Sequence, residues 1–155
     1  MNYSPLRYPG GKSKIAPLIR LIIEKTGYSG ITYIEPFAGG SGVALSLLFI
    51  GFVDKIVIND YDKAIYSFWR AIKESPKELI SLVKNTPITI EQWQQQKHIY
   101  CTNNQRYSIE LGFAAFYLNR TNRSGILNAG PIGGYNQTGN YGIDARFNRD
   151  ALIGR

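Results

Sequence analysis

One stretch of the chain decides the fold: Tyr33-Ile34-Glu35-Pro36-Phe37-Ala38-Gly39-Gly40-Ser41-Gly42. The residues that lead into it predict a short strand over Ile31–Glu35, which ends at Pro36 because proline lacks the N–H that a sheet requires. The glycines that follow let the backbone turn tightly and let a ligand approach it closely. The uniformly apolar run Val43–Ile50 then predicts a buried helix.

A second strand and an acidic residue extend this unit. Lys55–Ile58 predicts a strand whose Ile-Val-Ile run is typical of a parallel sheet covered on both faces, and Asp62–Lys73 predicts the next helix. The order strand, glycine loop, helix, strand is a βαβ unit. Asp60 follows the second strand, where nucleotide-binding units place an acid that accepts hydrogen bonds from ribose hydroxyls.

The glycine spacing narrows the choice of ligand. It does not follow the Gly-x-Gly-x-x-Gly pattern of dinucleotide sites, so a ligand with a ribose and no pyrophosphate fits better. A glycine-rich turn beside a surface aspartate is the alternative.

A second motif lies near the N-terminus, at Pro5-Leu6-Arg7-Tyr8-Pro9-Gly10-Gly11-Lys12. Its Pro-Gly-Gly predicts an open turn, and the apolar spacing that follows predicts a helix over Lys12–Thr26 that stops at Gly27. A cation at the start of a helix opposes the helix dipole, so local stability does not explain Lys12. A ligand carboxylate would explain it, and a solvated lysine is the alternative.

The second half of the chain has a different texture. Helices are predicted over Pro76–Lys84, over Thr89–Tyr100, where Thr89 and Gln92 fit a capping box, and over Arg106–Asn119. No strand separates them. The segment Thr121–Arg149 is rich in Gly, Asn, Arg and Tyr and lacks a helical period, which predicts a loop or a hairpin.

Composition limits the function. Basic residues outnumber acidic ones by 18 to 11 and give a formal charge of +7, which is compatible with a nucleic-acid partner without identifying one.

The single cysteine, Cys101, excludes an intramolecular disulfide and indicates a reduced thiol in a cytoplasmic protein. His98 has no partner at metal-ligand spacing, so no metal site is predicted. The longest apolar run, Val43–Val53, is too short to span a bilayer, and no membrane contact is predicted. Trp69 and Trp93 are assigned to the core.

Four motifs, taken in order, resemble those of the Dam-like (D12 class) adenine-N6 DNA methyltransferases. Each motif alone is moderately specific for this family, and four motifs in order at family-like spacing are strongly specific for it. The resemblance covers residues 5 to about 149. The motifs are Leu6-Arg7-Tyr8-Pro9-Gly10-Gly11-Lys12, Ile34-Glu35-Pro36-Phe37-Ala38-Gly39-Gly40-Ser41-Gly42, Asn59-Asp60-Tyr61-Asp62 and Phe116-Tyr117-Leu118-Asn119-Arg120-Thr121-Asn122-Arg123-Ser124-Gly125.

The resemblance implies an enzyme that transfers a methyl group from S-adenosylmethionine to N6 of adenine in double-stranded DNA. It implies an α/β, Rossmann-like methyltransferase fold, here with an incomplete sheet, and an inserted helical DNA-recognition subdomain. The cofactor-binding part would span 1–75, the target-recognition subdomain 76–149, and a truncated return to the catalytic domain 150–155.

The resemblance also implies roles for single residues. Lys12 would lie near the methionine carboxylate of the cofactor, Asp60 would bind the ribose hydroxyls, and Tyr61 would pack beside the adenine ring. The full cofactor set is Tyr8, Lys12, Glu35, Phe37, Gly39, Gly40, Gly42, Asp60 and Tyr61.

A second set would face DNA, because arginine suits both phosphate contacts and guanine readout. For any one of these arginines, a phosphate contact or plain solvation is a more common outcome than base readout. The set is Asn119, Arg120, Asn122, Arg123, Tyr135, Arg146 and Arg149.

The family's catalytic tetrapeptide, Asp-Pro-Pro-aromatic, is absent, because no two of the seven prolines are adjacent. Asn148-Arg149-Asp150 is no substitute, since it lacks the rigid prolines. Relatives carry the tetrapeptide downstream of the recognition hairpin, so we expect a truncated piece that is inactive alone, and no catalytic residue is assigned. The alternatives are a non-catalytic DNA- or cofactor-binding fragment that needs a second chain or an oligomer to complete the site, and an unrelated α/β nucleotide-binding protein.

Overall fold

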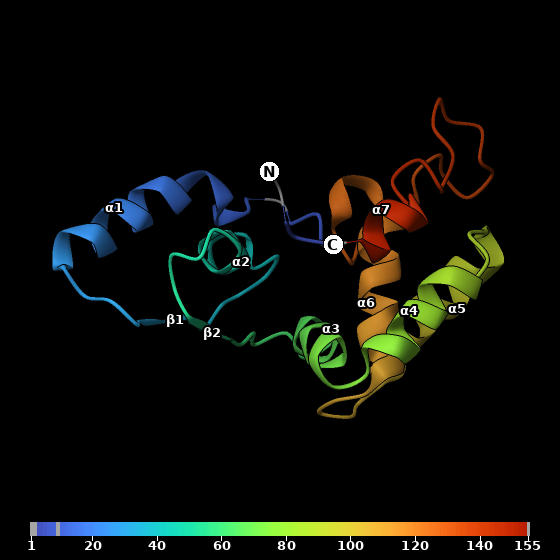
Figure 1. Ribbon diagram of the computed structural model, residues 1–155. Helices are drawn as coiled ribbons and strands as arrows, with labels where there is room; N and C mark the ends of the chain where they lie inside the picture. The colour runs from blue at the N-terminus through green and yellow to red at the C-terminus, as the bar shows by residue number, and fades with distance from the viewer. Residues whose placement is uncertain (1–2, 9, 155) are drawn as a thin grey trace.

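The computed structural model describes residues 3–8 and 10–154. Two regions are visible in Figure 1: a strand-bearing region with α1 and α2, and a helical region built from α3 to α7. A segment at the N-terminus, residues 3–8, runs between them and is called the strap below. Pro9, which belongs to the predicted Pro-Gly-Gly turn, lies outside the described residues.

The strand-bearing region follows the predicted order. Its elements are the 3-10 turn η1 (Lys12–Ile15), α1 (Ala16–Thr26), β1 (Thr32–Glu35), α2 (Gly42–Phe49) and β2 (Lys55–Ile58). Gly27 ends α1 in the left-handed conformation, with φ of 68°, as its place after the last apolar residue predicts. The two strands pair in parallel, so the βαβ unit is confirmed.

One face of this sheet is covered and the other is open. Tyr33 and Ile56 are paired in register and pack with α1 and α2 around Val43 and Leu47. Ile34 and Val57 point the other way and are 63% and 42% exposed. The prediction of a sheet covered on both faces is therefore wrong for the described residues, since both helices lie on the same side of the strands (Figure 1).

The predicted burial of the helix after the glycine turn is confirmed only in part. Val43, Ala44 and Leu47 of α2 are buried. Phe49 and Ile50 at its carboxyl end are about half exposed. The apolar run gave the helix correctly, but its length alone could not show which end would be covered.

The helical region contains α3 (Lys63–Glu74), α4 (Pro76–Asn85), α5 (Ile90–Thr102), α6 (Ile109–Thr121), the 3-10 turn η2 (Arg123–Gly125) and α7 (Arg149–Ile153). Side-chain caps fix four of the starts, and in the last of them Asn148 accepts from the Ala151 N–H of α7. Asp62 accepts from the Ala64 N–H, Thr89 from Gln92, and Ser108 from Leu111. The Ser108 cap explains why α6 begins at Ile109 and not at the predicted Arg106.

Helix α6 forms the centre of this region. Every residue from Leu111 to Thr121 is buried, and the helix packs against both α3 and α5. Gly112 allows the closest approach, because a Cβ there would lie 2.7 Å from the Ser67 carbonyl carbon of α3. Trp69 and Trp93 lie in the same core, as predicted.

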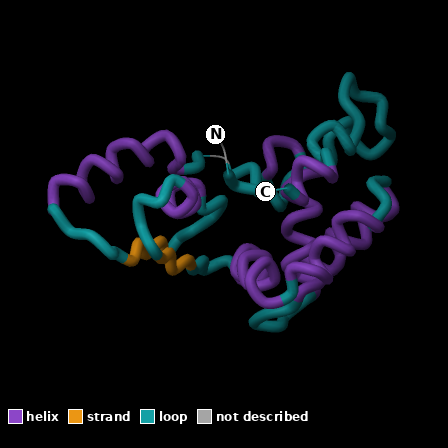
Figure 2. Tube along the Cα trace, in the orientation of Figure 1, coloured by secondary structure: helices purple, strands orange, loops and turns teal. Residues whose placement is uncertain are grey.

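The segment after α6 is a loop and not a hairpin. An isolated antiparallel bridge joins Asn122 to Pro131, and turns fill the rest of the segment up to α7 (Figure 2). In α7, Leu152 packs into the core that α4 and α6 share. No helix in the described residues is both long and apolar enough to cross a membrane.

Candidate functional site

The predicted motifs meet around one cleft of about 640 Å³. Its walls come from the strap, from the turn before η1, from the glycine turn between β1 and α2, and from the tip of β2. The lining residues are Ser4, Leu6, Arg7, Tyr8, Gly10, Gly11, Lys12, Ser13, Phe37, Ala38, Gly39, Gly40, Ser41, Gly42, Asp60 and Ser124.

Asp60 points at the glycine turn, as the sequence predicts. Its Oδ2 accepts a hydrogen bond from the Gly39 N–H at 2.7 Å, and its Oδ1 accepts from the Asp62 N–H at 3.0 Å. A carboxylate offers about four lone-pair positions. Two lone-pair positions of the Asp60 carboxylate therefore remain for ligand hydroxyls.

Lys12 is held at the rim of the same cleft. Its Nζ lies 3.2 Å from Glu35 Oε1 and donates to the Phe37 carbonyl at 2.6 Å. Glu35 is buried at the end of β1, and its other oxygen accepts from the Ala44 N–H of α2. An ammonium group has three donors, so one of the three stays available to a ligand anion.

The Tyr8 ring lies against the glycine turn. A Cβ on Gly39 would come within 2.9 Å of the ring, and one on Gly40 within 3.1 Å of the Tyr8 Cβ. Only glycine lets the strap approach this closely at Gly39, whose φ is also positive. Burial, with the charges of Asp60 and Asp62 nearby, raises the pKa of Tyr8.

Three residues that shape the cleft were not predicted as site residues. Trp69 of α3 donates from Nε1 to the Gly39 carbonyl at 2.8 Å, so this core side chain also holds the turn. Ser13 occupies the space that a Cβ on Gly42 would need. Ser41 is fully buried, and its hydroxyl has no hydrogen-bond partner among residues 3–8 and 10–154. The first two contacts could not be predicted, because Trp69 and Gly39, and likewise Ser13 and Gly42, lie far apart in the sequence.

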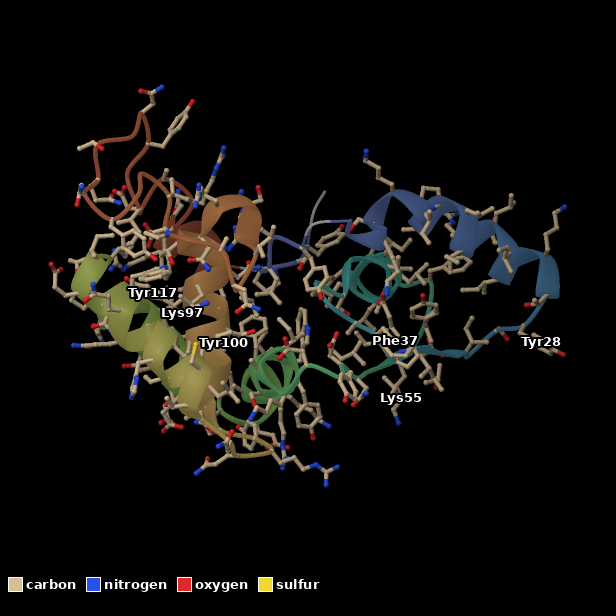
Figure 3. The ribbon with its side chains drawn as sticks, turned by 180° about the vertical axis from the view of Figure 1, so that it is seen from behind. Tyr28, Phe37, Lys55, Lys97, Tyr100 and Tyr117 are labelled. Carbon is tan, nitrogen blue, oxygen red and sulfur yellow. The ribbon has the colours of Figure 1, made fainter. Side chains whose placement is uncertain are left out.

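Two predicted cofactor residues, Glu35 and Tyr61, do not line the cleft. Tyr61 is 93% exposed. Phe37 lines it but is largely exposed, on the strand-bearing side of the molecule (Figure 3).

Asn119 and Arg120, both predicted to face DNA, hold the strap through side-chain hydrogen bonds. The Asn119 amide accepts from the Arg7 N–H and donates to the Arg7 carbonyl, both at 2.7 Å, and it also donates to Gly125 O at 2.9 Å. Arg120 is buried and donates from Nη2 to the Pro5 carbonyl. Both side chains are buried and hydrogen-bonded to the backbone around the cleft.

Asn122 and Arg149, also predicted to face DNA, hydrogen-bond to groups of the helical region. Asn122 is fully buried, accepts from Trp93 Nε1 at 2.6 Å, and donates to the carbonyls of Ile126 and Leu127. Arg149 donates to the Val83 and Thr86 carbonyls at the end of α4. A cation suits that position, because helix carboxyl ends carry unpaired carbonyls and partial negative charge.

The rest of the predicted DNA set is exposed. Arg123, Arg146 and Tyr135 lie on the loop surface, with Tyr135 packed edge-on against Trp93. Arg7 lines the cleft near them. Burial and the neighbouring Arg146 lower the pKa of Arg7, and its buried Nη1 has no hydrogen-bond partner in the described chain.

We expect Asn119→Asp to destabilise the protein by roughly 1–3 kcal/mol, because it removes two donors and leaves the Arg7 and Gly125 carbonyls unpaired. The free energy of unfolding in urea would measure this. Asn140→Asp, on the exposed loop, is the matched control and should change it by less than about 0.5 kcal/mol. Equal effects of the two substitutions would contradict the anchoring role.

Comparison with known proteins agrees with the resemblance carried by the four motifs. The sequence model of the D12 class N6 adenine-specific DNA methyltransferases matches residues 8–153. The chain is also 31% identical, over 87 residues, to the Type II methyltransferase M1.LlaDCHI of Lactococcus lactis subsp. cremoris. That alignment covers 55% of this chain and 28% of the relative. Since the family match extends over nearly the whole length, this chain belongs to the D12 class of N6 adenine-specific DNA methyltransferases.

Proposed function

We propose that this chain supplies the S-adenosylmethionine site and part of the DNA-binding surface of an enzyme that methylates N6 of adenine in double-stranded DNA. The observation that carries the proposal is that Asp60 and Lys12 are brought to one glycine-lined cleft in a chain of this family. Residues 1–75 would form the Rossmann-like cofactor part, and residues 76–149 the recognition subdomain.

The residues of the cleft fit this cofactor. S-adenosylmethionine carries a ribose and a carboxylate but no pyrophosphate. Asp60 keeps acceptor positions for ribose hydroxyls, and Lys12 keeps a donor for the carboxylate. The buried Ser41 hydroxyl offers a further polar group in the lining. The volume of about 640 Å³ lies within the range of small-molecule sites.

When bound, the cofactor supplies an electrophilic methyl group on its sulfonium. The residues of this chain would bind and orient it: Asp60 fixes the sugar, Lys12 the amino-acid end, and the strap closes over the glycine turn. The exocyclic amine of adenine is a poor nucleophile, because its lone pair is delocalised into the ring. By resemblance, the family meets this with the Asp-Pro-Pro-aromatic tetrapeptide, which this sequence does not contain.

The exposed basic residues support a DNA surface beside the cleft. Arg7 and Arg146 lie close enough for their charges to oppose each other, a cost that an anion between them would remove. Arg123 is exposed on the same loop, and the chain carries a formal charge of +7. Phosphate groups are the anions that DNA offers, and they supply most of its sequence-independent affinity.

A second candidate is a non-catalytic fragment that completes its site with another polypeptide. The open face of the sheet favours it, because Ile34 and Val57 expose apolar surface that a further layer would cover. This candidate shares the same cofactor cleft, so binding experiments test both.

We expect the 155-residue chain alone to transfer no tritium from labelled S-adenosylmethionine to DNA while still binding the cofactor. The reason is that nothing in the sequence matches the tetrapeptide that activates the amine. A family member that contains the tetrapeptide is the positive control for the assay. Transfer by this chain alone would refute the assignment of the chemistry to that tetrapeptide.

Asp60→Ala should weaken binding of S-adenosylhomocysteine, the stable product form, by at least about tenfold in calorimetry, because the ribose loses its acceptor. Asp54→Ala, an exposed acid at the start of β2, serves as the matched control. Circular dichroism would verify that both variants keep the wild-type fold. Unchanged affinity in a folded Asp60→Ala protein would sink the ribose assignment.

The double substitution of Arg123 and Arg146 by alanine should weaken binding to duplex DNA. It should also lower the slope of log affinity against log salt by about 0.9 for each phosphate that the variant no longer neutralises. Fluorescence anisotropy across a salt series would measure both quantities. Arg20→Ala, on the exposed surface of α1, is the control. A slope equal to wild type would show that DNA lies elsewhere.

A further inference from the structure

A separate cavity of about 400 Å³ lies among three helices of the helical region and shares no lining residue with the cofactor cleft. Helices α4 and α5 both pack against α6 (Figure 1). Gln92, Gln96 and Ile99 line the cavity from α5, and their spacing of four and three residues places them on one face of that helix. The volume is within the range of small-molecule sites.

Gln96 is the unusual residue of this wall. It is only 6% exposed, and its buried Oε1 has no hydrogen-bond partner among residues 3–8 and 10–154. Buried polar side-chain atoms are nearly always paired, and an unpaired acceptor destabilises the folded protein. A leucine would fill similar space in the helix without that cost. The unpaired amide oxygen therefore indicates a hydrogen-bond donor that comes from outside the chain.

The charges of the lining favour a cationic donor. The lining includes one acid, Glu110 at the start of α6, and no base. Glu110 is exposed, so its carboxylate lies where the cavity meets solvent. Asn85 donates from Nδ2 to Ser81 Oγ at 3.1 Å, which leaves Asn85 Oδ1 as a further acceptor. Hydrogen bonds from a charged donor to such acceptors are stronger than neutral ones.

The remaining walls suit an aliphatic stem. Leu82 of α4, Ile99 of α5 and Phe113 of α6 supply apolar surface from all three helices. A chain of methylenes gains free energy when such surface covers it. An ammonium head is compact and has three donors that can serve separate acceptors, whereas the planar guanidinium is shaped to grip one carboxylate with two bonds. The walls and the acceptors together match an aliphatic amine.

We propose that the cavity among α4, α5 and α6 binds a primary alkylammonium group, with Gln96 Oε1 accepting from the ammonium and Glu110 supplying the opposite charge. A free diamine and the lysine side chain of another polypeptide share this chemistry. The site is independent of the methyl-transfer assignment. Because a ligand that binds only the folded chain stabilises it, occupancy would stabilise the helical region.

The ligand test is a two-dimensional NMR titration of the full, isotope-labelled chain. Putrescine should cause saturable shifts at the Gln96 side-chain amide. N-acetyl-lysine methylamide carries the same head group on a peptide backbone and tests the second source. The neutral probe is n-butanol, which keeps an aliphatic stem and a hydroxyl donor but has no charge. It should bind at least about tenfold more weakly than putrescine.

Two variants test the residues. Gln96→Leu should weaken putrescine by at least about tenfold, because the acceptor is lost. Glu110→Gln should weaken it several-fold and reduce the salt dependence of binding. Gln94→Leu and Glu91→Gln are the matched controls, since both residues are exposed on α5 and lie outside the cavity lining.

Thermal unfolding gives a second readout that a folding defect would not mimic. Without a ligand, Gln96→Leu should unfold at the wild-type temperature or above it, because the unpaired acceptor is gone. Putrescine should raise the midpoint of the wild type and of Gln94→Leu, and it should leave that of Gln96→Leu unchanged.

Saturable binding of putrescine or of the lysine amide that is lost in Gln96→Leu supports the proposal, and the compound that binds more tightly identifies the source. If neither compound gives a saturable shift, the proposal is overturned and the amide oxygen is paired with water only. Equal binding of n-butanol, or unchanged putrescine affinity in Gln96→Leu, would also overturn it. None of these outcomes bears on the cofactor cleft, which has separate residues.

Discussion

Both backbone polar groups of Gly39 are held by side chains from other elements. Asp60, at the tip of β2, accepts from its N–H, and Trp69, on α3, donates to its carbonyl. These two bonds fix the glycine turn relative to the second strand and to the helical region at once. The strap can lie over the turn only because the turn is fixed and carries no Cβ at this position. The cleft is thus a product of contacts between three separate parts of the chain.

Local patterns in the sequence were sufficient for the elements that local chemistry determines. The stop of α1 at Gly27, the caps at Asp62 and Thr89, and the parallel pairing of two strands follow from residue type and spacing. The place of Asp60 beside the glycines follows as well, because a βαβ unit brings the carboxyl ends of its strands together.

The same patterns could not assign the polar residues at the end of α6. Asn119 and Asn122 belong to a motif that resembles the family, and their amides are chemically suited to read adenine. In the structure, the Asn119 amide hydrogen-bonds to the backbone of Arg7, which lies 112 positions away in the sequence. The Asn122 amide accepts from the indole N–H of Trp93. A motif indicates that a residue matters. The partner of such a residue depends on whether its side chain is buried. Tertiary packing decides that burial when the residue lies in a helix with apolar residues on most sides.

The two regions of the chain differ in how much hydrophobic core they contain. The helical region surrounds α6 with buried aromatic residues, whereas the strands have packing on one side only. Two strands make a small sheet, and sheets of this size gain much of their stability from what covers them. Ile34 and Val57 leave apolar surface open on the uncovered side of the strands.

The bonds between Asn119 and position 7 involve only the main chain of Arg7. An amide that grips main-chain atoms is indifferent to the side chain that they carry. The residue at position 7 can therefore be exchanged without removing the hydrogen bonds that hold the strap. Such an exchange would change the side chain that lines the cleft while the backbone around the cleft stays in place.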